Sequence, residues 1–185
     1  SSHLVLESTC SPLIQQNRIR DLARVLNNVG ANSGHAALLE TSIMRRAINV
    51  NLMKSLLDSS VEEIDGWIKL GQINPSFLPL RMSSLKFFHF LLLGQFGHIK
   101  TLLAGTSEHE ESAALKSIFA YTEGRLNDCF NLALETIKAQ KVKKTEINIP
   151  SIIALRLALM SSVIQDDDSK VSVISEISCI SVLTP

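Results

Sequence analysis

The clearest pattern in the chain is the recurrence of apolar residues at helical spacing. Between Arg125 and Gln140 the apolar positions fall at i, i+4, i+7, i+8 and i+11, with polar residues on the opposite side. The apolar positions are Leu126, Phe130, Ala133, Leu134 and Ile137. This periodicity predicts an amphipathic α-helix, and shorter stripes of the same kind recur through most of the chain.

Capping residues mark where several of these helices are expected to begin. Ser11-Pro12 offers an N-cap followed by a proline in the first helical position, and Pro150 opens a later helix in the same way. The segments 60–63 and 107–110 both have the capping-box form S-x-x-E, in which a hydroxyl and a carboxylate satisfy free backbone N–H groups. Each box therefore predicts a helix start.

Glycine and asparagine indicate where helices are expected to end. Gly30, Gly71, Gly105 and Gly124 each follow an apolar run and are expected to act as C-caps or helix breakers. The triplet at 49–51, Asn-Val-Asn, is expected to kink or end the helix that begins after Gly34. The sequence then resumes a short apolar stripe from Leu52.

These signals together predict an all-α fold. They give about eight helices in antiparallel hairpins, because the connecting turns are short, and the result is a short α-solenoid or an irregular helical bundle. We expect a flexible segment over 1–10, a helical-repeat or bundle domain over 11–165, and a C-terminal tail over 166–185. Residues 171–182 alternate Val, Ile and Ser but also satisfy a helical stripe, so this tail is a helix or a partner-docked strand.

One predicted hairpin, 112–122 followed by 125–140, resembles a tetratricopeptide unit. Small residues and the turn carry the resemblance: Ala113, Ser117, Tyr121, Gly124, Cys129 and Ala133. Thr136 and Ile137 stand where that family has an alanine, and the pattern does not repeat around Gly94. The resemblance to the tetratricopeptide-like α-solenoid superfamily implies helical-hairpin geometry for this one hairpin.

The apolar content of the chain bears on two questions, how much surface is buried and whether a helix spans a membrane. Hydrophobic residues make up 45% of the chain and charged residues 19%, which favours extensive burial, part of it against another chain. The two longest apolar segments, 87–93 and 151–164, are shorter than the roughly 18 to 20 residues that a membrane span requires. We therefore expect both to be buried core helices and predict no membrane span.

The charges balance, with 18 basic and 18 acidic residues, so the sequence gives no field that would attract nucleic acid. One basic cluster can form a rim that orients an acidic partner. It consists of Arg18, Arg20, Arg24, Arg45 and Arg46. A second cluster, Lys138, Lys141, Lys143 and Lys144, follows a helix end, where cations complement the helix dipole. A nucleic-acid-binding helical array that uses both clusters is one alternative.

No motif for catalysis, metal binding or a cofactor is present in the sequence. The histidines lack metal-ligand spacing, and no nucleophile elbow or glycine-rich phosphate loop occurs. Cys10, Cys129 and Cys179 are odd in number and far apart, which favours a reducing, intracellular location, cytoplasmic or nuclear. An α-helical enzyme with a site assembled from His89, His98 and Glu110 is the second alternative.

Amphipathic helices without reactive groups indicate recognition by shape. The sequence therefore predicts a non-enzymatic scaffold that binds a peptide or partner subunit within a larger complex. Either a protein partner or a second copy of the chain would cover the apolar surface, with the arginine rim setting the orientation.

Overall fold

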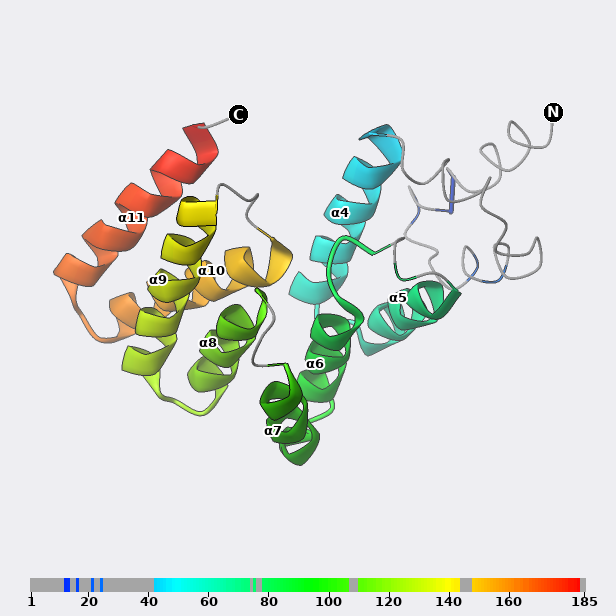
Figure 1. The fold of residues 1–185 in the computed structure, drawn as a ribbon, viewed down its shortest axis with the longest axis horizontal. Coiled ribbons are helices and arrows are strands. Elements are labelled where there is room, and N and C mark those ends of the chain that lie inside the picture. Colours follow the sequence, from blue (N-terminus) through cyan, green and yellow to red (C-terminus); the bar gives the residue numbers. More distant parts are fainter. Residues whose placement is uncertain are drawn as a thin grey trace. The chain divides into compact units, whose positions relative to one another are not determined.

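The computed structural model describes residues 42–73, 75, 78–106, 110–143 and 148–183, together with Pro12, Leu13, Gln16, Asp21 and Arg24. This part of the chain forms eight α-helices and contains no strand, so the all-α prediction is confirmed (Figure 1). The contacts divide the chain into two compact units, Ser1–Ile99 and Lys100–Pro185. The predicted single domain over 11–165 spans this division, and its behaviour as one domain stays a prediction.

Unit 1 is built around α5, which packs against α4 and α6. The helices are α4 (Ser42–Leu57), α5 (Val61–Ile73) and α6 (Met82–Leu92), and the first turn of α7 (Phe96–Gly105) also belongs to this unit. Its fully buried large side chains are Leu52, Ile64, Trp67, Leu70, Leu85, Phe87 and Ile99. The indole Nε1 of Trp67 donates a 3.1 Å hydrogen bond to Ser55 Oγ, which joins α5 to α4 inside this core.

The start of α5 forms half of its predicted capping box, and the interior of α4 differs from the prediction. The N–H of Glu63 donates to Ser60 Oγ at 3.3 Å. The reciprocal bond is not formed, because the Ser60 N–H donates to the Ser55 carbonyl oxygen at 3.3 Å instead. The expected break at residues 49–51 is wrong, because α4 runs through it without interruption. Ile48 and Leu52 are one turn apart on α4 and both buried, so packing holds the helix together through the asparagines.

Gly71 has a different role from the predicted C-cap. It lies inside α5, which continues to Ile73, and it is buried. A Cβ at this position would overlap with the Leu78 side chain and lie 2.5 Å from Met82 Cε. Gly71 is therefore a close-packing residue, where the segment leading into α6 and α6 itself approach the α5 backbone.

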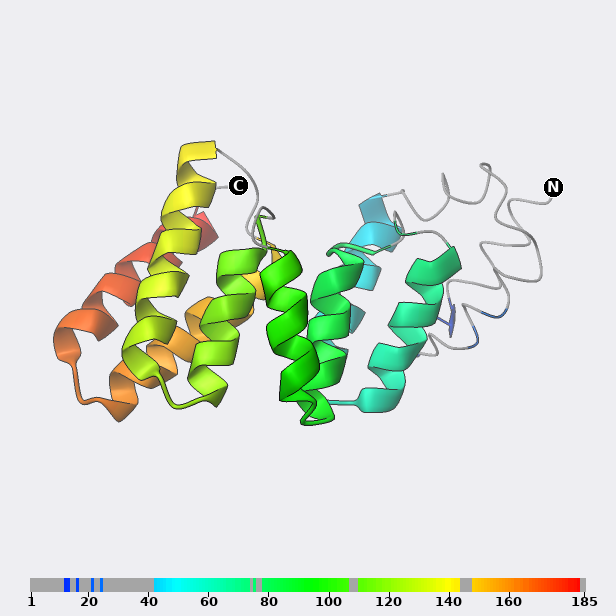
Figure 2. The same cartoon turned by 60° about the horizontal axis from the view of Figure 1, so that its bottom comes forward.

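Unit 2 contains the end of α7 and four further helices. These are α8 (Ser112–Thr122), α9 (Leu126–Lys143), α10 (Ile149–Ile164) and α11 (Asp168–Leu183). Helices α8 and α9 form the predicted hairpin, turning at Gly124 with φ of +74°, and α10 packs against both (Figure 2). The amphipathic α9 is confirmed, and the C-terminal tail is helical. Helix α8 begins at Ser112 with Glu111 as its N-cap, without a side-chain hydrogen bond. The predicted box at 107–110 lies outside the described residues except for Glu110.

Small and polar residues fill the contacts among α8, α9 and α10. Ala133, Ala154 and Ala158 are fully buried there. Asn148 caps α10, as its Oδ1 accepts from the Ser151 N–H at 3.0 Å and from the Ser151 hydroxyl at 2.6 Å. Between helices, Gln140 Nε2 of α9 donates to Ser151 Oγ of α10 at 2.9 Å, so a buried polar bond links these two helices.

None of the helices in the described ranges combines the length and the apolarity that crossing a bilayer requires.

Candidate functional site

The arginine rim predicted from the sequence lies largely beyond the described side chains. Arg24 is exposed, and its Nη1 lies 3.4 Å from Asp21 Oδ1. Arg18 and Arg20 are outside the described residues, and Arg45 and Arg46 belong to α4 with side chains that the structure does not describe. The structure therefore neither brings these five residues together nor separates them, and the rim stays a prediction.

The histidines of the alternative enzyme site take part in ring packing. His98 stacks on Phe90, with centroids 5.2 Å apart and planes 25° apart, and His89 is tilted against the same ring at 6.4 Å. Both lie in unit 1, whereas Glu110 lies in unit 2. Within the described ranges no three His, Cys, Asp or Glu side chains are grouped so that they could hold a metal ion.

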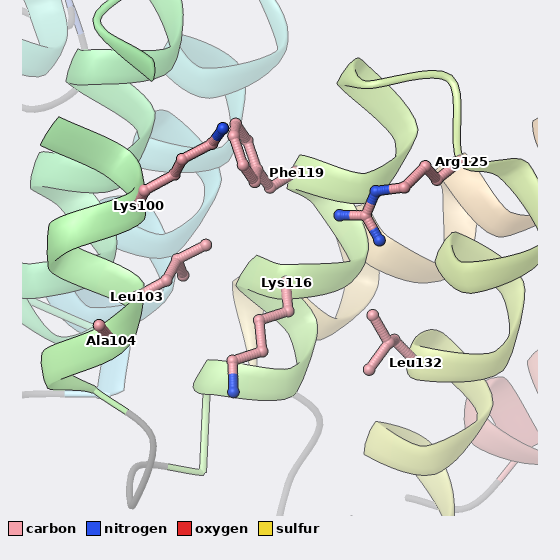
Figure 3. Close-up of a pocket in the computed structure, with 7 residues that line it drawn as sticks. All are labelled: Lys100, Leu103, Ala104, Lys116, Phe119, Arg125 and Leu132. Atoms are coloured by element: carbon pink, nitrogen blue, oxygen red, sulfur yellow. The ribbon is translucent and has the colours of Figure 1, made fainter. Parts of the chain in front are cut away.

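A shallow depression of about 350 Å³ lies in unit 2, beside the end of α7 and against α8 and α9. Its lining residues are Lys100, Leu103, Ala104, Lys116, Phe119, Arg125 and Leu132. Figure 3 shows Lys100 and Leu103 extending from α7 on one side, with Arg125 and Leu132 on the side of α9. The lining has an apolar floor with cationic side chains around it.

Of the three cationic residues in the lining, Lys100 and Arg125 form ion pairs. Arg125 binds Glu123 Oε2 through Nη2 at 2.7 Å and Asp128 Oδ2 through Nη1 at 2.7 Å. These hydrogen bonds, the one to Glu123 first, raise the pKa of the Arg125 guanidinium above its ordinary value. Lys100 Nζ lies 3.9 Å from Glu123 Oε1. Since two of the three cations are already compensated and the lining residues include no carboxylate, cysteine, serine or histidine, the depression favours apolar contact over chemistry.

A second hollow, of about 570 Å³, lies along the outer side of α9. Its lining residues are spaced as one helical face: Asn131, Leu134, Glu135, Lys138, Ala139 and Val142. Polar and apolar residues alternate along it, and Val142 at its end is 83% exposed. The mixed character gives no single ligand class a clear advantage.

Helix α10 has an unusual distribution of side-chain size between its two sides. Its buried side, which we call the α10 inner face, consists of Ile149, Pro150, Ser151, Ala154, Leu155, Ala158, Ser161 and Ser162. Its exposed side, the α10 outer face, consists of Ile152, Arg156, Leu159, Met160, Val163 and Ile164. From Ser151 onward, five of the six buried residues are serine or alanine and the sixth is Leu155, while five large apolar side chains remain accessible to solvent.

The exposure of the α10 outer face corrects the expectation that 151–164 is a buried core helix. Val163 is 62% exposed and Ile164 61% exposed. Five of the eleven large apolar side chains that are exposed among the described residues belong to this one helix. A helix that is apolar on all sides is typically covered on all sides, so the α10 outer face lacks a cover in the described structure.

Hydropathy does not separate the two sides of α10, so the apolar pattern of the sequence does not predict this surface. A signal was nevertheless present in the sequence. All three serines of 151–162 fall on the buried side of the helix, and Leu155 is the only large aliphatic residue of 151–164 that is buried with them. Ile153 and Leu157 are intermediate, and the other large aliphatic residues are exposed. A reading by side-chain volume would have found it. The buried Ser161 and Ser162 hydroxyls donate to the carbonyls of Leu157 and Ala158, at 2.8 and 2.9 Å, so their burial costs little.

No protein-family model, curated protein or solved structure matches the chain. The resemblance of the 112–140 hairpin to a tetratricopeptide unit therefore stays a prediction.

Proposed function

We propose that this chain is a non-enzymatic interaction scaffold that binds a protein partner through the α10 outer face. The observation that carries the proposal is the burial pattern along α10 from Ser151 onward, where three serines and two alanines are buried together with Leu155, and five large apolar residues are exposed. A helix that only completed a core would place Ile152, Met160 and Val163 inward, because their burial is worth far more than that of serine.

The free energy available from covering this face supports stable binding. Full burial of one aliphatic side chain contributes about 1.5 to 3 kcal/mol, and five side chains on the outer face are roughly half exposed. Covering them would contribute on the order of 5 kcal/mol before the entropic cost of association. Additional contacts, such as those of the apolar depression beside α8, would add to it.

The proposal includes an intracellular location, cytoplasmic or nuclear. Cys129 is a free thiol and is fully buried between α8 and α9, in a contact that depends on its small size. A reducing compartment keeps such thiols unpaired. Cell fractionation with an antibody against the chain would check this part of the proposal.

The test of the scaffold function uses the full chain and two matched pairs of charge substitutions. The first pair, Met160→Glu with Val163→Glu, changes the α10 outer face, and the second, Lys138→Glu with Lys141→Glu, changes exposed positions on α9. Proteins that co-purify with the wild-type chain from the cells that make it are then produced separately and titrated against each variant.

We expect a partner that binds the purified wild-type chain directly, binds the α9 pair equally well and fails to bind the α10 pair. Circular dichroism of both pairs should match that of the wild-type chain, because all four side chains are exposed. Equal binding by both pairs would contradict the proposal. A chain that stays solitary and turns over a metabolite would also contradict it.

A further inference from the structure

We infer that the occupant of the α10 outer face is an amphipathic helix of another protein that places one Asp or Glu opposite Arg156. This inference rests on the proposed function and specifies the chemistry of the partner. It is carried by the spacing of the outer face, by the position of Arg156 within it, and by the poor fit of the other possible occupants.

The outer face has the spacing of a two-helix seam. Ile152, Arg156, Leu159 and Val163 follow one another at intervals of four, three and four residues, and all four are exposed. Alternating intervals of three and four are the pattern by which two helices pack side by side, with each side chain entering a gap on the facing helix. The 16 residues of α10 span about 24 Å, which accommodates roughly two heptads.

Arg156 occupies one of the four seam positions instead of the rim. Ile152 precedes it by one turn, Met160 follows it by one turn and Val163 by two turns, so aliphatic residues flank it along the helix. With the other described residues Arg156 makes no hydrogen bond or ion pair. Covering the seam would desolvate this guanidinium, and an unpaired buried charge is strongly unfavourable.

A carboxylate on the occupant removes that penalty. The guanidinium offers a planar set of donors that matches both oxygens of an Asp or Glu, and such pairs are shorter and stronger than neutral hydrogen bonds. A single polar residue at a seam position also fixes the register and the choice of partner. The outer face therefore selects for an apolar helix with one acid near its middle.

A second copy of the chain fits the outer face poorly. In a parallel pairing of two α10 helices the two Arg156 side chains would lie beside each other. In an antiparallel pairing centred on the seam they would lie about 4.5 Å apart along the helix axes, because each is about one and a half residues from the centre. The outer face contains no acidic residue that could pair with either of them, so like charges would oppose each other.

A membrane surface also fits poorly. An amphipathic helix at a bilayer keeps its cations on the polar side and buries an uninterrupted apolar side. Arg156 lies in the middle of the outer face and would enter the acyl region most deeply, which is costly for a charged group. A protein helix with an acidic residue remains as the occupant that satisfies both the spacing and the charge.

The experiment begins with a photo-crosslinking amino acid at Leu159 of the full-length chain, in cells that make the protein. The matched control carries the same amino acid at Asn131, an exposed position on α9. We expect the Leu159 probe to crosslink a second protein, at a helix with Asp or Glu within one turn of the crosslinked residue. The control should give no crosslink to that protein.

Charge reversal with the purified pair then tests the carboxylate. We expect Arg156→Glu to weaken binding about 30-fold or more, and Arg or Lys in place of the partner's acid to restore it. Met160→Gln, which leaves the guanidinium in place, should weaken binding without changing the preference for the acid. Unchanged circular dichroism would show that Arg156→Glu still folds.

Each other outcome overturns the inference in a distinct way. A crosslinked partner whose affinity does not respond to Arg156→Glu, or whose binding helix has no acid, overturns the charge assignment and leaves the scaffold function intact. Crosslinks to a second copy, to lipid or within the same chain identify a different cover for the outer face. The absence of any crosslink at Leu159 overturns both the inference and the proposed use of this face.

Discussion

The hydroxyl of Ser117 on α8 donates a 2.7 Å hydrogen bond to the backbone carbonyl oxygen of Cys129 on α9. A side chain as short as serine reaches the facing backbone only where two helices are very close. Both residues are fully buried, and Ala133 one turn further along α9 is buried as well. The small residues that carry the sequence resemblance to a tetratricopeptide hairpin therefore have a direct physical role in unit 2.

Substitutions at Ser117 should show that size matters more than the hydrogen bond. Ser117→Ala removes one buried bond and should lower the free energy of unfolding by about 1 kcal/mol. Ser117→Leu must also separate α8 from α9, and overpacking should raise the loss to about 3 kcal/mol. Urea unfolding followed by circular dichroism measures both, with Ser172→Ala and Ser172→Leu on the exposed side of α11 as controls. Equal losses for Ala and Leu at Ser117 would argue against close packing there.

Gly71 and Gly97 should respond to the same substitution with opposite signs. Both lie in helices, and alanine has the higher helix propensity by about 1 kcal/mol. Nothing lies within 4 Å of a Cβ added at Gly97, whereas one added at Gly71 overlaps with the Leu78 side chain. We expect Gly97→Ala to stabilise the chain by up to about 1 kcal/mol and Gly71→Ala to destabilise it by about 1 to 2 kcal/mol.

The fluorescence of Trp67, the only tryptophan in the chain, measures the Gly71 effect directly because it lies on the same helix. The Gly97 effect can be followed by thermal unfolding with circular dichroism. If Gly71→Ala proves stabilising, then the side chains of Leu78 and Met82 move aside without cost and Gly71 is not required for close packing.

How far the sequence predicts this fold depends on whether a helix has two chemically different sides. Helix α9 was predicted closely, because Leu126, Phe130 and Ile137 alternate with polar residues at helical spacing. Gly71 was misread, since its role depends on Leu78 and Met82 reaching the α5 backbone after a turn. Local sequence patterns predict the helices, but they do not predict the contacts between helices.

The candidate site was harder to predict for the same reason. Arg125, Glu123 and Asp128 lie within five residues, so their ion pairs could have been expected from spacing alone. The exposed side of α10 could not be predicted from the sequence in this way. Ile152 and Leu155 have similar hydropathy, and only the position of the neighbouring helices decides which of the two is covered. Surface assignment in an apolar helix needs the neighbouring helices.

Asp167 should make the start of α11 sensitive to acid. Its Oδ1 accepts hydrogen bonds from Ser169 Oγ at 2.7 Å and from the Lys170 N–H at 3.2 Å, and its Oδ2 lies 3.4 Å from Lys170 Nζ. These interactions, with the Ser169 hydrogen bond first, lower the pKa of Asp167 below its ordinary value. A depressed carboxyl pKa contributes stability above the unfolded-state pKa, and this contribution is lost as the pH falls through the folded-state pKa.

The first turn of α11 should therefore stay intact at neutral pH and loosen only below about pH 4. The amide proton shift of Lys170, followed by NMR during an acid titration, reports on this carboxylate. Asp167→Asn keeps an N-cap acceptor but removes the ionisation, so its Lys170 shift should stay flat over the same range. A midpoint above the ordinary value for Asp would show that the Ser169 and Lys170 contacts do not hold the charge.

Two adjacent residues on α10 provide the sharpest test of its orientation. Hydropathy alone suggests that Ser162→Leu is harmless on an apolar helix and that Val163→Ser damages the core. The structure predicts the opposite, because Ser162 is fully buried while Val163 is mostly exposed. Ser162→Leu has no space and should lower the free energy of unfolding by about 1 to 3 kcal/mol, whereas Val163→Ser should change it by less than about 0.5 kcal/mol.

The affinity of the same two variants for the partner should separate an effect on recognition from an effect on folding. Val163→Ser removes an aliphatic side chain from the seam, so it should weaken binding to the partner while urea unfolding stays unchanged. Ser162→Leu should weaken binding only as far as it displaces α10, and residual binding should track the fraction of folded chain. If Val163→Ser proves to be the destabilising change, the helix is rotated and its aliphatic side faces the core of unit 2, which would remove the surface on which the scaffold proposal depends.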